Sequence, residues 1–216
     1  MVIAPGILAR GPWEPDKVRC TWHEEPFEPS ADAALAADAA IAALAARGSP
    51  SHDGTSTRLV GLESGPGGLS LELQPTRWAL RLNPVDAGQS LASMCVVRAA
   101  DGSWLAGRRA GWVASWPGRW ALGAGGSVDS GESPVATLTR ELQEEWSVRP
   151  DRLTVELLDC LPQRLVLMVG MAWLADGATV TPDDEHDAYA WWPADPARWP
   201  AEADGAVREV GAVLAS

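Results

Sequence analysis

The chain has 216 residues, 46% of them hydrophobic and 21% charged, which is enough to bury a full core. Its formal net charge is −12, with 7 basic and 11 acidic residues before Gly88 and 10 basic and 18 acidic residues after it. This acidity argues against non-specific binding of nucleic acid, which needs a basic surface.

The three cysteines, Cys20, Cys95 and Cys160, are odd in number and far apart in the sequence. Their spacing fits neither a disulfide framework nor a metal-binding cluster, so it favours a reducing compartment. No stretch approaches the roughly 18 apolar residues that a membrane span needs. The first residues also lack the charged region of a signal peptide. We therefore expect a cytoplasmic protein that does not contact a membrane.

The first 29 residues are rich in proline, tryptophan and glutamate and show no sustained hydrophobic period. They predict an extended arm that packs on the body or is partly disordered. Ser30 is a good N-cap for the alanine-rich segment that follows it. Gly48 is a typical stop signal, so the pattern predicts a helix from Ser30 to about Arg47.

The pattern changes to strands after residue 58. Residues 59–62 and 69–73 flank the turn sequence SGPGG, which predicts a β-hairpin. Residues 78–82 predict either a third strand or a short helical turn. Together with the helix, these elements define an expected N-terminal extension over residues 1–88.

A second part begins near Gly88 and has the pattern of an α/β domain over residues 89–216. Strands are predicted at residues 93–98, 104–109, 153–158, 164–174 and 188–192. The strand at 164–174 is apolar almost throughout, which is typical of a central strand. One helix is expected after residue 133 and another at about 203–214. This order predicts a mixed sheet with helices.

An acidic cluster lies in the middle of this second part. On a helix, Glu141, Glu144 and Glu145 fall at positions i, i+3 and i+4, so their carboxylates project from one face. Like charges at this spacing repel each other and weaken a solvated helix. A hard divalent cation reverses that effect, because clustered carboxylate oxygens are the ligands of Mg²⁺ or Mn²⁺.

The segment around these glutamates resembles the Nudix box, G-x5-E-x7-R-E-U-x-E-E-x-G-U, in which U is an aliphatic residue. Gly126, Glu132, the run Arg140-Glu141-Leu142-Gln143-Glu144-Glu145 and the final Val148 stand at the required spacing. One position departs from the pattern, because Ser147 replaces the last glycine. That glycine usually ends the helix in a left-handed conformation, which costs another residue about 1 kcal/mol.

The resemblance implies a Nudix-type α/β/α sandwich with a mixed sheet, preceded here by the helix and hairpin extension. It also implies hydrolysis of a diphosphate linked to another group, commonly in a nucleoside diphosphate derivative, with Mg²⁺ or, as a substitute, Mn²⁺. Carried over by position, the metal would be held by Glu144, Glu145, the carbonyl of Gly125 and Glu141, which is a further ligand or the base.

Two more box residues would support these ligands. Glu132 would contact a metal-bound water or Arg140, and so belongs to the expected metal site. Arg140 would orient the glutamates through charge-assisted hydrogen bonds and is expected among the catalytic residues.

Residues outside the box are also candidates for the site. Arg108 and Arg109, at the end of a predicted strand, resemble basic positions that face a substrate phosphate in the family. The acidic loop before residue 188 offers Asp183, Asp184, Glu185 and His186 as general base, and we favour Glu185 because it lies just before a strand. The aromatic residues Tyr189, Trp191 and Trp192 offer rings that stack on a base or sugar. Alternation along the strand favours core packing for at least one of these tryptophans.

Two other functions stay open at this point. A Nudix-type module can bind a nucleotide without cleaving it, as a sensor. The WPGRW run also resembles isopentenyl diphosphate isomerase, but that enzyme needs a paired-histidine metal site, and His23, His52 and His186 are not spaced as a pair. The expected partner is a small nucleotide-type substrate, and a homodimer through the N-terminal hairpin is possible.

Overall fold

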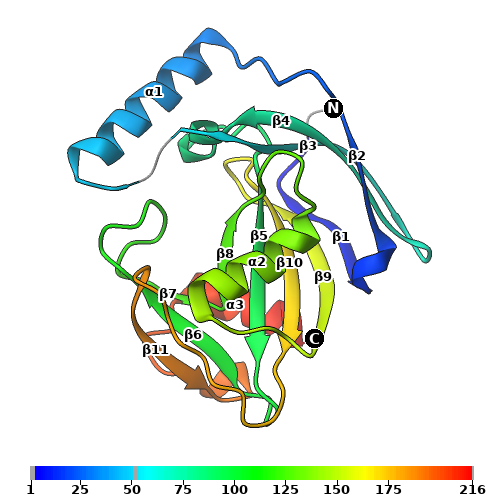
Figure 1. Ribbon diagram of the computed structural model, residues 1–216, viewed down its shortest axis with the longest axis vertical. Coiled ribbons are helices and arrows are strands. Elements are labelled where there is room, and N and C mark those ends of the chain that lie inside the picture. Colours follow the sequence, from blue (N-terminus) through cyan, green and yellow to red (C-terminus); the bar gives the residue numbers. More distant parts are fainter. Residues whose placement is uncertain (1–2, 51–52, 216) are drawn as a thin grey trace.

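A computed structural model describes residues 3–50 and 53–215 and builds them around a mixed eight-stranded sheet (Figure 1). The strands of this sheet are β1 (Gly6–Trp13), β5 (Leu91–Arg98), β6 (Trp104–Arg109), β7 (Trp120–Leu122), β8 (Ala124–Ser127), β9 (Arg152–Cys160), β10 (Val166–Trp173) and β11 (His186–Trp192). Their order is β1-β9-β10-β5-β6-β11, with β7 paired to β6 and β8 paired to β5. Only β10 and β5 run parallel, so the predicted mixed sheet is confirmed.

Two helices cover the two faces of this sheet. They are α2 (Pro134–Trp146) and α3 (Gly205–Ala215), seen in front of and behind the sheet in Figure 1. Successive side chains of β5 point to opposite faces. Cys95 and Val97 therefore join one core with Leu138 of α2, whereas Val96 joins the other core with Val207 of α3. The α/β/α sandwich is thus confirmed.

The N-terminal part forms a second, three-stranded sheet with one helix above it. Its strands are β2 (Val18–Trp22), β3 (Thr55–Gly65) and β4 (Gly68–Arg77), in the order β2-β4-β3. The predicted hairpin is confirmed, because β3 and β4 pair antiparallel up to Gly65 and Gly68. Its strands extend beyond the predicted ranges.

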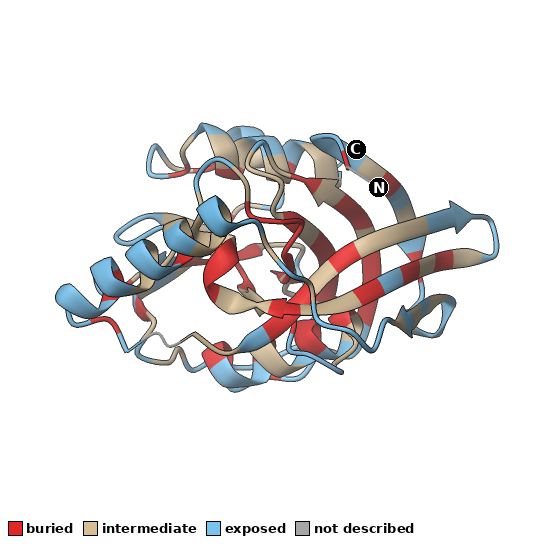
Figure 2. Ribbon diagram, turned by 90° about the horizontal axis from the view of Figure 1, so that it is seen from above, coloured by how far each residue is buried: buried red, intermediate tan, exposed pale blue. Residues whose placement is uncertain are grey.

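The helix α1 (Ala31–Ala46) also matches its prediction. The Ser30 side chain accepts a hydrogen bond from the Ala33 N–H at 3.3 Å, and Arg47 closes the other end. Only Ala37 and Leu44 of α1 are buried, and Figure 2 shows the helix exposed along most of its length. Residues 78–82 adopt the short helical alternative, as the 3-10 helix η2 (Trp78–Leu82).

The arm expected over residues 1–29 is extended and packs on the body from residue 3 onward, as one alternative predicted, but it forms strands that were not expected. This segment contains β1, a short 3-10 helix η1 (Pro15–Lys17) and β2. Strand β1 pairs with β9 of the large sheet, and its register shifts between Ile7 and Ala9 and again between Arg10 and Trp13. Those irregularities, and the exposure of many of its residues, remove the alternating pattern by which a strand is recognised. The first residues therefore belong to the sheet of the second part.

The two sheets share a core. Leu59, Leu69, Leu71 and Leu73 of the small sheet are almost fully buried, in the same cluster as Leu138 of α2. Figure 2 shows this buried stretch along the two long strands. Main-chain pairing joins the sheets further, through bridges from Ser56 to Asp129 and from Arg58 to Ser90. The extension is therefore fixed against the segment that precedes α2.

Three further expectations concern the cysteines, membrane-spanning segments and His52. The three cysteines are all free thiols, as expected from their spacing. No helix among the described residues is long and apolar enough to cross a membrane. His52 lies outside the described residues.

The last turn of α2 supplies a prediction about stability. Ser147 closes the helix at φ 54° and ψ 33°, the left-handed conformation that the resemblance implied. Because only glycine adopts this conformation without steric cost, Ser147→Gly should raise the free energy of unfolding by about 0.5–1 kcal/mol. Urea denaturation measures the change. Ser147→Ala, which keeps the Cβ atom, is the matched control and should show no such gain.

Candidate active site

Local contacts fix the position and rotation of α2. Ser133 accepts a hydrogen bond from the Val135 N–H at 3.2 Å, and Pro134 occupies the first turn, where no N–H is needed. Near the other end, the Trp146 indole N–H donates to the carbonyl of Gly123 at 3.0 Å. Leu138 is fully buried against the sheet. The opposite face of α2, which carries the carboxylates, is therefore aimed at the β8 strand.

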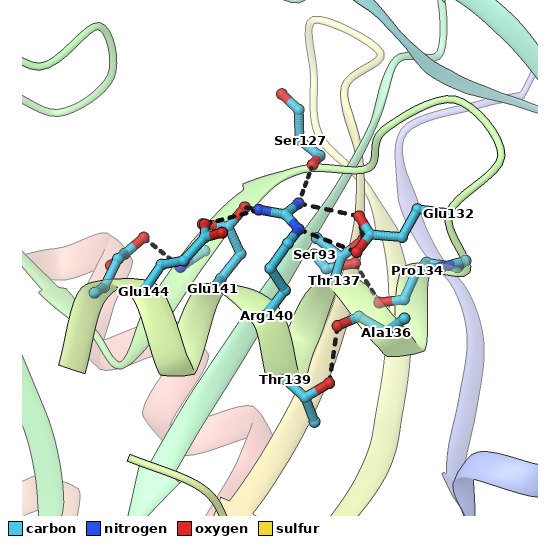
Figure 3. Close-up of polar contacts among 12 residues, drawn as sticks. Ser93, Ser127, Glu132, Pro134, Ala136, Thr137, Thr139, Arg140, Glu141 and Glu144 are labelled. Carbon is cyan, nitrogen blue, oxygen red and sulfur yellow. Dashed lines mark hydrogen bonds and ion pairs between the residues drawn. The ribbon is translucent and has the colours of Figure 1, made fainter. Parts of the chain in front are cut away.

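A single guanidinium holds the polar residues of this face together (Figure 3). Nε and Nη2 of Arg140 donate to the two oxygens of Glu132, both at 3.0 Å. Nη1 donates to Glu141 at 2.8 Å and to Glu144 at 2.9 Å. Burial opposes ionisation of Glu132, but hydrogen bonds from Arg140 and Thr137 hold its pKa below the ordinary value. Arg140 thus orients three carboxylates at once.

Glu141 lies against the backbone of the glycine that begins the box. A Cβ atom at position 126 would lie 2.0 Å from Glu141 Oε1, so a larger residue there would displace this carboxylate. The Glu141 side chain is 12% exposed. Burial raises its pKa to about 7, although Arg140 opposes the shift and Glu144 adds to it. This carboxyl group exchanges a proton near neutral pH.

Glu145 is the most deeply buried of the three glutamates, with a side chain only 4% exposed. Its Oε1 accepts a hydrogen bond from the Gly125 N–H at 3.1 Å. Its Oε2 has no hydrogen-bond partner among the described residues; Arg109 Nη1 lies 3.7 Å away and His186 Nε2 3.6 Å away. Burial raises the pKa of Glu145 well above its ordinary value, against the pull of Arg109.

The end of β6 brings one of its two arginines to this cluster. Arg109 is largely buried, and its Nη2 lies 2.8 Å from Oε2 of Glu185. Arg108 points away and binds the exposed Asp187 at 2.6 Å. Successive residues of a strand face opposite sides, so the two arginines separate. The structure therefore brings Arg109 and Glu185 to the box and does not bring Arg108 there.

His186, the first residue of β11, lies next to Glu145. Its ring stacks on the Trp146 indole with centroids 4.5 Å apart, and its Nδ1 lies 3.3 Å from Asp183. Burial, helped by nearby Arg109, lowers the pKa of His186, so the ring favours the neutral form. The sequence offered His186 only as one of four candidate bases, because nothing in the loop shows that its ring is buried.

The aromatic residues of β11 divide between the two faces. Tyr189 lies near Trp146 on the α2 side, with ring centroids 5.9 Å apart. Trp192 is buried on the α3 side, where its ring lies 5.2 Å from Trp199 and 5.6 Å from Trp120. Trp192 is therefore a core residue, and the structure does not place it where it can stack on a substrate. Core packing was the alternative that strand alternation favoured.

Two adjoining cavities open beside these residues. The acidic cavity, of about 390 Å³, contains Arg140, Glu141, Glu144 and Glu185 in its wall. The apolar cavity, of about 500 Å³, is lined by Met94, Trp116, Leu167, Val207 and Val210 among others, and reaches Glu145. Both cavities share Arg81, Arg109, Ala114, Ser115, Gly125 and Gly126. A molecule with an ionic part and an apolar part fits such a pair.

Arg81 is the wall residue that sequence reasoning missed. It belongs to η2 in the N-terminal extension, and its Nη1 donates to the hydroxyl of Ser127, the second residue of the box. Burial lowers its pKa, and Glu141 opposes that shift. No sequence motif links η2 to the box, so only the fold reveals this contact.

The donor set of the acidic cavity suits a hard divalent cation. Carboxylate oxygens are the preferred ligands of Mg²⁺, and the buried Glu145 Oε2 accepts no hydrogen bond from the described residues. Among the described residues, no three acidic, histidine or cysteine side chains converge as a ready-made metal site. In this structure the positive charge of Arg140, in place of a metal ion, lies among the glutamates. The residues fit a metal by type, after rotation of Glu141 and Glu144 away from Arg140.

The fold and the site together define an α/β domain in which the glycine-rich strand β8 is followed by α2, the helix that carries the carboxylates. The model of the NUDIX domain family matches residues 88–211, and the chain belongs to this family. Members of the family are typically pyrophosphohydrolases that use a divalent metal. No curated protein matches the sequence.

Several solved structures resemble this chain distantly. The MutT protein from Methanosarcina mazei Go1 shares 22% identity at a TM-score of 0.44, over 57% of this chain and 90% of that one. An Ap4A hydrolase from C. elegans, solved as a binary complex, shares 21% at 0.45, over 57% and 92%. The NUDIX domain of Shewanella oneidensis NrtR, complexed with ADP ribose, shares 19% at 0.44, over 59% and 86%.

The raised pKa of Glu141 predicts a pH dependence of stability without metal. Its folded pKa of about 7 lies above the ordinary 4.5, so the favourable contribution is full below pH 4.5 and is lost as pH rises through 7. In EDTA, wild type should therefore lose roughly 2 kcal/mol between pH 5 and pH 8 relative to Glu141→Gln. Urea denaturation at several pH values measures this difference. The exposed Glu63→Gln is the control, and parallel curves for wild type and Glu141→Gln would contradict the prediction.

Proposed function

We propose that this chain is a metal-dependent hydrolase that cleaves a diphosphate linkage in a nucleoside diphosphate derivative. The observation that carries the proposal is the buried Oε2 of Glu145, which accepts no hydrogen bond from the described residues and lies beside two further glutamates on one face of α2. Three carboxylates repel each other, so this arrangement costs stability unless a cation joins it. A catalytic function explains why the cost is tolerated.

The proposed ligands of Mg²⁺, or of Mn²⁺ as a substitute, are Glu141, Glu144, Glu145 and the carbonyl of Gly125. When bound, such an ion neutralises phosphate oxygens and acidifies the attacking water. Arg140 would then keep its two hydrogen bonds to Glu132, which already exist without the metal.

Glu185 is the proposed general base. It faces the acidic cavity, its side chain is 37% exposed, and Arg109 fixes one of its oxygens at 2.8 Å. In the reaction, a water oxygen forms a new bond to phosphorus while the bridging P–O bond breaks. The water proton passes to Glu185, and the leaving phosphate departs as an anion. Glu141, with a pKa of about 7, is the alternative base within the box.

The two cavities support a substrate with two chemically different ends. The diphosphate would occupy the acidic cavity together with the metal. The nucleoside or its attached group would occupy the apolar cavity, where Trp116 offers a ring that is 41% exposed. Their shared wall at Gly125 and Gly126 permits one molecule to span both.

A non-catalytic nucleotide sensor is the second proposal. The hydrogen bonds of Arg140 to three glutamates favour it, because they give the cluster a stable state without metal. Titration calorimetry separates the two functions. A nucleotide that binds in Mg²⁺ or Mn²⁺ without turnover would favour the sensor.

Glu145→Gln tests the metal-dependent mechanism. A panel of UDP-sugars, ADP-ribose, oxidised nucleoside triphosphates and dinucleoside polyphosphates is incubated with the protein and Mg²⁺, and product release is followed. The substitution should lower kcat/KM by at least about a hundredfold, because it removes a charged ligand. Glu63→Gln should leave the rate unchanged. Turnover in EDTA, or full activity in Glu145→Gln, would contradict the mechanism.

Glu185→Gln tests the base separately from the metal site. The change should lower kcat by roughly 100-fold or more, since general base catalysis is lost. Mn²⁺ affinity, measured by calorimetry, should stay within twofold of wild type, whereas Glu145→Gln should weaken it. A wild-type kcat in Glu185→Gln would assign the base to another residue, with Glu141 next in order.

A further inference from the structure

The wall of the acidic cavity contains three arginines, which differ in whether they form ion pairs with carboxylates. Arg140 binds three glutamates, and Arg109 pairs with Glu185. Arg81 forms no ion pair with any carboxylate of the described residues. Among the described residues, its guanidinium donates to the Ser127 hydroxyl and lies over the Trp78 ring, whose centroid is 5.7 Å from the guanidinium carbon.

The place of Arg81 is also unusual. It lines both the acidic and the apolar cavity, so it lies at their junction. A guanidinium is a planar donor that suits phosphate oxygens, and a partly buried one interacts strongly because water screens it poorly. The surrounding wall is acidic, with Asp129, Glu141, Glu144 and Glu185, so it repels an anion elsewhere.

The N-terminal extension holds Arg81 firmly in this position. The N–H of Ala79 donates to Asp53 at 3.0 Å, and the N–H of Trp78 donates to the Gly54 carbonyl at 2.8 Å. Ala79 and Leu80 are buried against Ala37 of α1. The helix α1 therefore packs on the short turn that carries Arg81, although it does not itself line either cavity.

We infer that Arg81 is a substrate-binding residue that the N-terminal extension contributes to the active site, and that it binds a phosphate of the diphosphate where the two cavities meet. The inference rests on the proposed function, because it takes the ligand to be a diphosphate. It gives residues 1–88 a direct part in recognition. Binding of the metal itself does not depend on Arg81.

Equilibrium binding of methylenediphosphonate, a non-hydrolysable diphosphate, tests the inference in saturating Mn²⁺ by calorimetry. Arg81→Gln should weaken binding by about tenfold to a hundredfold, since a charge-assisted hydrogen bond is lost. Arg81→Lys should recover part of the affinity because it restores the charge. Mn²⁺ affinity without the probe should stay within twofold of wild type in both variants.

Arg19→Gln is the matched control, because it removes a positive charge from an exposed position of the same extension. It should bind the probe like wild type. Arg81→Met provides a second neutral variant if Arg81→Gln fails to fold, as judged by circular dichroism. Wild-type affinity in either folded neutral variant overturns the inference. So does failure of both neutral variants to fold, since Arg81 would then be structural.

The outcomes separate this inference from the proposed function. A wild-type protein that binds methylenediphosphonate through Arg81 and hydrolyses no substrate of the panel supports the inference and contradicts the hydrolase. A wild-type protein that does not bind the probe in Mn²⁺ overturns the inference, whatever its activity.

Discussion

The repulsion among carboxylates on one face of α2 is the constraint on which the site depends. Glu141 and Glu145 are buried, and burial raises the pKa of both. One guanidinium, from Arg140, offsets part of this cost by binding Glu132, Glu141 and Glu144. Because Glu145 receives only one main-chain hydrogen bond, the cluster keeps an unsatisfied oxygen at its buried end. The helix can tolerate this strain because Leu138 and Trp146 anchor its other face in the core.

The two parts of the chain are coupled through the same region. The small sheet packs its leucines in the core that α2 completes, and its β3 strand bridges to Asp129, just before the helix. The turn η2 then places a guanidinium beside Ser127. A Nudix domain with this extension therefore has a cavity wall drawn from segments more than 40 residues apart. The wall of the acidic cavity therefore contains residues from both sides of the division at Gly88.

The sequence predicted well wherever local chemistry decides the structure. The helix that begins after residue 133, its left-handed end at Ser147 and the strand over residues 104–109 all depend on neighbouring residues, and each was found as expected. The box spacing placed its glutamates on one face for the same reason. Long-range choices could not be predicted: which of Arg108 and Arg109 faces the cluster depends on the pairing of β6, and the role of Arg81 depends on how two sheets pack.

Strand β1 also protects the edge of the large sheet against pairing with a second copy of the chain. It covers β9, a nine-residue strand that would otherwise offer unpaired N–H and C=O groups to another chain. In its place the sheet ends in a strand with two register shifts and with Gly11 and Pro12 near its C-terminal end, which is a poor template for pairing. The first residues thus protect the edge of the sheet. A shortened chain that begins at residue 89 would expose the unpaired edge of β9, which favours aggregation.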